Sequence, residues 1–366
     1  MTLAARARAA ATPWGTAMAP NDSPNGLHDA YAGPDRTTPD AGAPALVASL
    51  VPLARELTTL KRVHAAGRPG SWAGRAFARA WTRLAAGQRA DEVMRMELVA
   101  AVVATRLGAI DAEFFAAERL PQTRVYRAMR RGWLGAVRAL APAACDALHA
   151  TAGEGAGALT AHIAESFAAA HEVQLPAPGF VARLADQPRA GPTRPDTPRL
   201  MLVPMESHAE HCWAVAVTAA LLAPAYGARP AEVFVAGLAH HLANAWLPDA
   251  GDAADVTLGD ALTDLVPVLR ARALAELPAD VRATAERALR VPPAAGTPDA
   301  CAFHAADALD RVLEMEWFAR VAAFGLDDAL GERPGAFDVL HPGPNQAVER
   351  AALRAAGLLP AGSAPA

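Results

Sequence analysis

Three stretches in the second half of the chain decide its fold: ESHAEHCWAVAV at 206–217, AEVFVAGLAHHLANAWLPD at 231–249 and HAADALDRVLEM at 304–315. All three lie on expected helices, and the second of these helices begins with Pro230 and has Glu232 in its first turn. The same reasoning predicts helices at 207–222, 230–246, 278–291, 298–324 and 345–358. No segment alternates polar and apolar residues between turn signals as a strand does, so we do not expect a sheet.

The composition of the 366-residue chain also favours helices. Hydrophobic residues make up 52% of the sequence while aromatic residues make up only 5%, so the apolar content is mostly alanine, leucine and valine. These residues suit closely packed helices. We therefore predict an all-α protein, and the length of the chain favours two domains over one.

The balance of charge argues against a nucleic-acid partner. The net charge is -4 with a pI near 6.3, and the sequence contains no block of lysine or arginine. A small anionic substrate remains compatible with this balance. Lys61 is the sole lysine among many arginines, which we attribute to codon usage rather than to function.

The sequence indicates neither export nor membrane insertion. Cys145, Cys212 and Cys301 are far apart and odd in number, so no disulfide framework is expected and a reducing cytoplasm is the expected compartment. The N-terminus lacks the continuous apolar segment of a signal peptide, and no stretch reaches the ~18 apolar residues of a membrane span. We therefore predict a cytoplasmic protein without a membrane partner.

Proline-rich segments divide the chain. Residues 1–43 contain NDSPNG and GPDRTTPDAGAP without helical or strand periodicity, and we predict that they are disordered. Residues 185–199 carry four prolines and interrupt two long helical regions, as an interdomain linker would. The predicted organisation is thus a helical domain at 44–184, the linker, and a second helical domain at 200–366.

In this order the three stretches resemble the H…HD…D pattern of the HD superfamily of metal-dependent phosphohydrolases, in particular the bacterial 5'-deoxynucleotidase type. The resemblance covers about residues 200–325. It implies an HD-type helical bundle whose metal ligands fall at His211, His240 and Asp307. It also implies a divalent transition metal, such as Mn, Co, Ni, Zn or Fe, that activates water against a small phosphomonoester such as a nucleoside monophosphate.

The chain departs from the family pattern at the metal centre. His241 stands where the family has the aspartate of the HD pair, and histidine can still coordinate a metal although it adds no negative charge. Asn244 stands where the family has a glutamate, and an amide cannot transfer a proton at neutral pH. Asp249 matches the family's second acidic position and is a candidate sugar contact or general acid. The family's phosphate-binding arginine is missing, and Arg199 is a displaced substitute.

Other polar residues on these helices have simpler explanations. A histidine on an apolar helix is usually a hydrogen-bonded core residue, which is our interpretation of His208 and His304. Asp310 lies near the face of Asp307 by its i,i+3 spacing, but we interpret it as a solvated helix carboxylate.

The first half of the chain resembles the second half without its ligands. GSWAGRAFARAWTRLAAGQRADEV aligns with HCWAVAVTAALLAPAYGARPAEV, which pairs Trp72 with Trp213, and AHIAESF aligns with AFHAADAL, which pairs Glu165 with Asp307. The offsets are 141 and 142 residues, so we predict two tandem bundles, the first a degenerate copy of the second. The copies would form an intramolecular pseudo-dimer, as HD proteins of this type form homodimers. An unrelated helical domain is the alternative.

Functions from different classes fit these observations. The first is an HD-type phosphohydrolase that acts on a small phosphorylated molecule. The alternative is a catalytically inactive HD-fold pseudoenzyme that serves as a scaffold or a ligand-binding regulator, which His241, Asn244 and the missing arginine favour. An oxidative di-iron HD enzyme is a third hypothesis, but it needs further histidine and carboxylate ligands that we cannot place between the motifs.

Overall fold

The computed structural model describes residues 43–169, 176–190, 202–251, 257–294 and 296–322. These residues are mostly helical, and they contain no strand, only two isolated bridges that join Ala65 to Arg68 and Pro188 to Ser207. The prediction of an all-α protein is therefore confirmed for the part of the chain that is described. Residues 1–42 of the expected disordered segment and the expected helix at 345–358 lie outside it.

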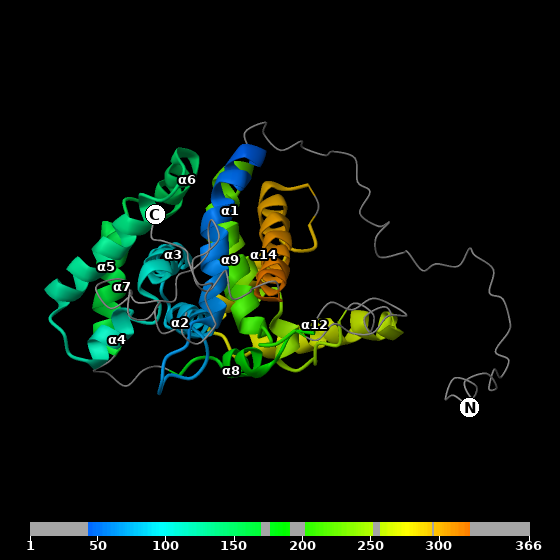
Figure 1. Cartoon of the computed structure of the whole chain (residues 1–366). Coiled ribbons are helices and arrows are strands. Elements are labelled where there is room, and N and C mark those ends of the chain that lie inside the picture. Colours follow the sequence, from blue (N-terminus) through cyan, green and yellow to red (C-terminus); the bar gives the residue numbers. More distant parts are fainter. Residues whose placement is uncertain (1–42, 170–175, 191–201, 252–256, 295, 323–366) are drawn as a thin grey trace, which may run out of the picture. The chain divides into compact units, whose positions relative to one another are not determined.

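Helices make up most of the described structure (Figure 1). Those of the first half are α1 (Ala43–Thr59), the 3-10 helix η3 (Leu60–Arg62), α2 (Trp72–Ala85), α3 (Ala90–Leu107), α4 (Ala112–Ala117), α5 (Gln122–Val137), α6 (Pro142–Ala152), α7 (Ala156–Ala169) and α8 (Gly179–Asp186). Those of the second half are α9 (His208–Tyr226), α10 (Pro230–Ala239), the 3-10 helix η4 (Leu242–Ala245), α12 (Asp260–Leu274), α13 (Ala279–Ala288) and α14 (Pro298–Ala322).

Most of the expected helices of the second half are present. Helices α9, α13 and α14 correspond to the ones predicted at 207–222, 278–291 and 298–324. The helix predicted at 230–246 is interrupted, because α10 ends at Ala239 and the chain continues as η4. Helix α12 was not predicted. None of the described helices combines the length and the hydrophobicity that a bilayer-spanning segment needs.

Helix α9 is the central element of the described structure. A capping box starts it: the Ser207 hydroxyl accepts from the backbone N–H of Glu210, and the Glu210 carboxylate accepts from the backbone N–H of Ser207. All of its residues except Pro224 and Tyr226 are buried. A helix that is buried on every face needs neighbours all around it. Helices α1, α2, α6, α8, α10 and α14 supply them, and Figure 1 shows α9 between α1 and α14.

Helix α10 approaches α9 more closely than a side chain would allow. Gly237 faces Ala216, and a Cβ atom built on Gly237 would lie 2.4 Å from the Cα of Ala216 and 2.5 Å from its backbone nitrogen. Glycine is therefore required at this crossing. The contact fixes the end of α10, and with it His240, against the helix that carries His211.

The two halves share one hydrophobic core. The buried cluster contains residues from α1 to α14, and several helices of the first half pack against α9. At this junction the indole rings of Trp72 and Trp213 meet edge to face, with their centroids 5.4 Å apart. The packing of α9 therefore depends on the first half of the chain as much as on the second.

The order of helices is compatible with a duplication, but their packing differs. Trp72 and Trp213 lie in α2 and α9, and Glu165 and Asp307 lie in α7 and α14, so all four aligned residues fall on helices. Helix α14 lies along α9, whereas α7 packs mainly against α3, α4 and α5. The tandem arrangement stays a prediction.

The described part of the predicted linker is tied to the start of α9. Helix α8 ends inside the predicted linker, at Asp186, and the backbone N–H of Arg189 donates to the carbonyl of Glu206 at 2.8 Å. The backbone N–H of His208 donates to the carbonyl of Gln187 at 3.0 Å. Residues 191–199 lie outside the described residues. The tied segment places Arg189 next to the histidine-bearing end of α9.

Replacing Gly237 with alanine should destabilise the protein by about 2 kcal/mol, because the added methyl group forces α10 away from α9. The matched control is Gly135→Ala on α5, where an added Cβ meets no described atom within 4 Å and the exchange should stabilise the helix by about 0.5–1 kcal/mol. Urea denaturation measures both changes. Equal stability of the two variants would contradict the close contact.

Candidate metal centre

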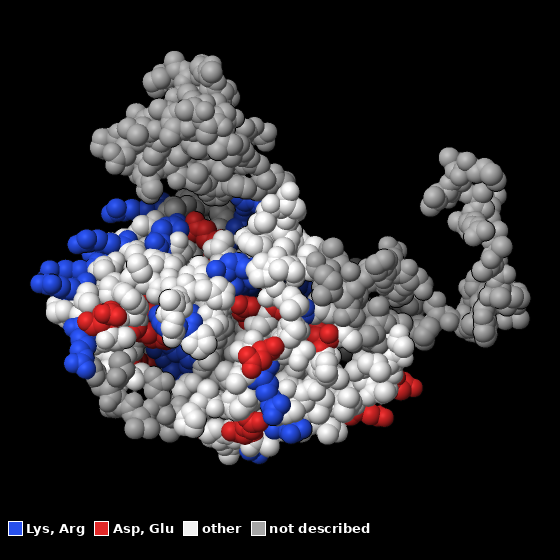
Figure 2. Space-filling model, turned by 60° about the horizontal axis from the view of Figure 1, so that its bottom comes forward, with Lys and Arg blue, Asp and Glu red and all other residues white. Residues whose placement is uncertain are grey.

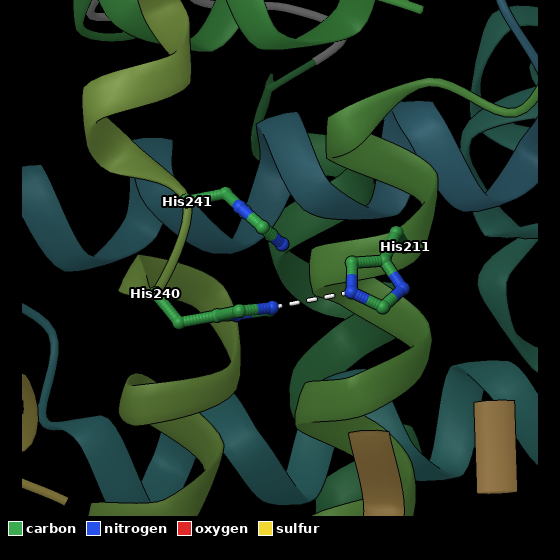
Figure 3. A group of neighbouring side chains, drawn as sticks. All are labelled: His211, His240 and His241. Carbon is green, nitrogen blue, oxygen red and sulfur yellow. Dashed lines mark hydrogen bonds between the residues drawn. The ribbon is translucent and has the colours of Figure 1, made fainter. Parts of the chain in front are cut away.

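Histidines from two helices meet beside a third helix. His211 lies near the start of α9, His240 caps the end of α10 and His241 follows it directly. One nitrogen of each ring lies within 4.8 Å of the others, and Figure 3 shows His240 and His241 pointing towards His211. Asp307 of α14 joins them, with its Oδ1 atom 3.2 Å from Nε2 of His211. The structure thus brings the three predicted histidines together and places Asp307 against one of them, His211. The function of these four residues as ligands stays a prediction.

The two adjacent histidines reach one site because the helix ends at them. Successive side chains of a regular helix point about 100° apart. At His241 the backbone leaves the helical conformation, with φ -104° and ψ 21°, a region of backbone space where active-site residues are often found. The ring centroids of His240 and His241 are consequently 4.2 Å apart. A continuous helix at 230–246, as predicted, would have directed the two rings to different faces.

Each of the three rings uses its Nδ1 atom for a hydrogen bond to a different oxygen. The acceptors are a carboxylate, a backbone carbonyl and a side-chain amide oxygen, so Nδ1 carries a proton in each ring. In His240 and His241 the Nε2 atom then keeps its lone pair, whereas Nε2 of His211 also faces a carboxylate, that of Asp307. The pairs are His211 with Asp310 at 2.8 Å, His240 with the carbonyl of Gly237 at 2.7 Å, and His241 with Oδ1 of Asn244 at 3.0 Å. Metal-binding histidines are typically oriented in this way by a second hydrogen bond.

The Nε2 atoms of His211 and His240 face each other at 3.2 Å (Figure 3). Two lone pairs at this separation repel each other unless a proton or a cation lies between them. Two nitrogens bound to one ion at about 2.1 Å lie roughly 3.0–3.4 Å apart in octahedral or tetrahedral coordination, so the observed separation fits a shared ion. Imidazole and carboxylate donors suit divalent Mn, Co, Ni, Zn or Fe.

Burial keeps two of the three rings neutral. Burial, followed by the charge of His211, lowers the pKa of His240 to about 3. Burial, followed by the charges of His240 and His211, lowers the pKa of His241 well below its ordinary value. His211 differs: burial and Arg189 act to lower its pKa, but the hydrogen bonds to two aspartates outweigh them and raise it. When no metal ion is bound, His211 is therefore the ring that takes up a second proton and becomes positively charged.

Asp307 is ionised at neutral pH and partly exposed. Burial acts to raise the pKa of Asp307, but the hydrogen bond and charge of His211 outweigh it and hold the pKa below its ordinary value. The Asp307 side chain is 24% exposed, and Nη1 of Arg311 lies 3.9 Å from its Oδ2 atom. This carboxylate supplies the negative charge of the four predicted ligands.

The two residues predicted to be catalytic already have partners in the protein. The amide of Asn244 accepts from His241 and donates to the carbonyl of Leu247 at 3.4 Å. Asp249 accepts from the backbone N–H groups of Ala190 and Gly251, each at 2.9 Å. Asn244 thus orients a candidate ligand, and Asp249 ties the predicted linker to the loop after η4.

The two histidines assigned to the core differ in their environments. His208 is buried, as expected, with Nε2 3.4 Å from Oδ2 of Asp249 and its ring centroid 4.7 Å from that of His241. His304 was wrongly assigned, because it is exposed. Its neighbour Phe303 is buried and packs against His240, so His304 lies on the side of α14 that faces solvent.

Sequence reasoning missed the residues behind His211. Asp310, which was interpreted as solvated, is only 2% exposed. Lys61 and Glu206 are also buried, and the ammonium of Lys61 donates to both acidic residues. The i,i+3 spacing located Asp310 on the correct face of α14 but did not reveal that η3 covers this face. The available signal was the lysine itself, which stands alone among arginines.

Comparison with protein-family models, curated proteins and solved structures finds no match to this chain. The candidate centre is therefore supported by its own geometry and by the sequence pattern. Among the described residues, two groups have the spacing to hold a metal ion, and both include His211. The described part of the first half contains no such group.

The contribution of Asp249 to stability should depend on pH. Burial acts to raise the pKa of Asp249, but the hydrogen bonds from His208 and Ala190 outweigh it and lower the pKa from 3.8 to about 2. A lowered pKa stabilises the folded protein above the unfolded-state value, and this contribution is lost as the pH falls towards 2. We therefore expect Asp249→Asn to be less stable than wild type at pH 6, with the difference shrinking between pH 5 and pH 3.

Urea denaturation across this pH range measures that difference. The control is Asp146→Asn on α6, because Asp146 is exposed and forms no described ion pair. A difference between wild type and Asp249→Asn that stays constant with pH would contradict the assigned interactions.

Proposed function

We propose that this chain is a metal-dependent phosphohydrolase of HD type that acts on a small phosphomonoester. One divalent transition ion would be held by His211, His240, His241 and Asp307. The observation that carries the proposal is that all three imidazoles commit Nδ1 to an acceptor while one nitrogen of each converges on a common site. A nucleoside monophosphate is the substrate implied by the sequence resemblance.

A bound divalent ion would supply an acidified water and a positive charge for the phosphoryl oxygens. The protein determines how much of that positive charge remains. The neutral side chains of His240 and His241 add no negative charge, so Asp307 contributes the one negative charge of the ligand set. The family's set of two histidines and two aspartates contributes two. This centre should therefore polarise its water strongly but retain the ion weakly.

A cavity of about 180 Å³ is lined by Glu206, which lies near His211, and not by the four proposed ligands, and we propose it as the place for the substrate's phosphate group. Arg189 lines this cavity, and its charge contributes to the lowered pKa of His240 and His241 and opposes the rise in the pKa of His211. Its Nη1 atom contacts Glu206 at 2.8 Å, while its Nε atom has no hydrogen-bond partner among the described residues. The other charged residues that line the cavity are acidic, so an anionic group would depend on Arg189. We propose it as the phosphate contact in place of Arg199, which lies outside the described residues.

A catalytically inactive scaffold or ligand-binding regulator is the second candidate function. The observation that favours it is the absence of a proton donor at the two family positions. Asn244 is an amide, and Asp249 has a pKa of about 2, so neither can protonate a leaving group at neutral pH. A metal could still bind in such a protein and hold α9, α10 and α14 together.

We expect wild-type protein to bind metal weakly and to release phosphate slowly or not at all. Restoring both family residues, in the double variant His241→Asp with Asn244→Glu, adds a negative charge and a group that can transfer a proton. Phosphatase activity should then rise at least roughly tenfold. The measurement is release of inorganic phosphate from a panel of nucleoside monophosphates with added Mn²⁺, Co²⁺ or Ni²⁺.

The control for this experiment is His240→Ala, which should abolish both metal binding and any phosphate release. Elemental analysis of each purified variant reports whether the ion is bound. Rapid wild-type turnover that survives His240→Ala would refute the proposed centre. A double variant that binds metal in stoichiometric amount and still releases no phosphate would favour the scaffold.

A further inference from the structure

The sole lysine of the chain is buried beside the candidate centre. Lys61 lies in η3, in the first half, and its side chain is 0% exposed. Its ammonium donates to Glu206 and to Oδ1 of Asp310 at 2.7 Å, and it lies 3.7 Å from Oε2 of Glu314. The surrounding carboxylates make this position a site for a cation. Codon usage alone therefore does not explain why a lysine stands at position 61.

The three carboxylates of Glu206, Asp310 and Glu314 form what we call the acid pocket. Buried carboxylates this close together repel one another and require compensating charge. The compensation is complete by count, because three carboxylates meet three cations. The cations are Lys61 in the middle, Arg62 on Glu314 and Arg189 on Glu206. Burial acts to lower the pKa of Lys61, but the carboxylates, Asp310 first, outweigh it, so the ammonium is charged.

The acid pocket also has the spacing of a metal site. Oxygens of Glu206 and Asp310 and a nitrogen of His211 lie within 4.8 Å of one another. Asp310 connects the pocket to the candidate centre, since its Oδ1 atom accepts from Lys61 while its Oδ2 atom accepts from Nδ1 of His211 at 2.8 Å. The ammonium therefore occupies the position where a second cation would neutralise these carboxylates.

We infer that Lys61 takes the place of a second metal ion. Its ammonium fills the acid pocket, holds Asp310 in the orientation that fixes the His211 ring, and limits the centre to one ion. The part of this inference that assigns a metal ion to His211 rests on the proposed function. The arrangement of the acid pocket around Lys61 does not depend on the proposed function. Occupation of the pocket by a side chain also argues against a di-iron centre.

A lysine suits this position better than an arginine. An ammonium is a compact charge with three donors, which can be shared among three carboxylates. A guanidinium is planar and larger, and in this chain the arginines Arg62 and Arg189 pair with the outer sides of the pocket. The lysine is thus the one cation of this group that lies close to all three acids.

Replacing Lys61 with methionine tests the inference, because methionine is unbranched and similar in length but uncharged. The three carboxylates of the acid pocket supply oxygen ligands, which Ca²⁺ prefers to imidazole. We expect the full-length Lys61→Met protein to bind about one Ca²⁺ per chain, with Tm raised by roughly 5 °C in excess Ca²⁺. Wild type should gain neither. Affinity for Co²⁺ at the histidines should fall tenfold or more, because Asp310 no longer orients His211.

Two control variants accompany this experiment. Lys61→Arg keeps the positive charge and should gain no Ca²⁺ site. Leu60→Met changes a buried neighbour in η3 without changing charge, and its Tm should not respond to Ca²⁺. Both controls separate a loss of charge from a general loosening of η3.

The result that overturns the inference is a Lys61→Met protein that folds without gaining a Ca²⁺ site. Failure of this variant to fold both with and without Ca²⁺ also overturns it, because a true replacement of a cation predicts rescue by one. The proposed function fails separately, if wild type binds no Co²⁺. In that case a Ca²⁺ site gained by Lys61→Met would still support the exchange of ammonium for metal.

Discussion

The contact between Gly237 and Ala216 is the constraint on which the candidate centre depends. It brings the backbones of α9 and α10 together at a distance that no other residue allows. Gly237 also offers its carbonyl to Nδ1 of His240, so one residue sets both the distance between the helices and the orientation of a ring. The 3.2 Å separation between the Nε2 atoms of His211 and His240 follows from this packing.

Electrostatics then determine what the centre can hold. The buried carboxylates behind His211 are paired with two arginines and one lysine of the protein. The facing Nε2 atoms of His211 and His240 have no such cationic side chain between them and can share only a proton. The first group is therefore complete without a metal ion and the second is not. Basic and acidic side chains both occur on the face drawn in Figure 2, so this face has no general excess of acid to match the buried carboxylates.

The sequence allowed the helical fold and the four histidine and aspartate positions to be predicted, because apolar periodicity and motif order are local properties of the chain. It did not reveal the break after Ala239, since the apolar pattern continues to Trp246 and hides the end of α10. It also did not reveal the burial of Asp310. That burial depends on η3, which lies about 250 positions earlier in the sequence, and no local pattern records such a distant contact.

Lys61 belongs to the first half of the chain, while the carboxylates that surround it belong to the second. These buried ion pairs therefore link the two halves of the chain. A recombinant that joined this second half to a first half without the lysine would bury a net negative charge beside its central helix. Position 61 is thus coupled electrostatically to positions 206, 310 and 314, so that a change of charge at one of them alters the environment of the other three.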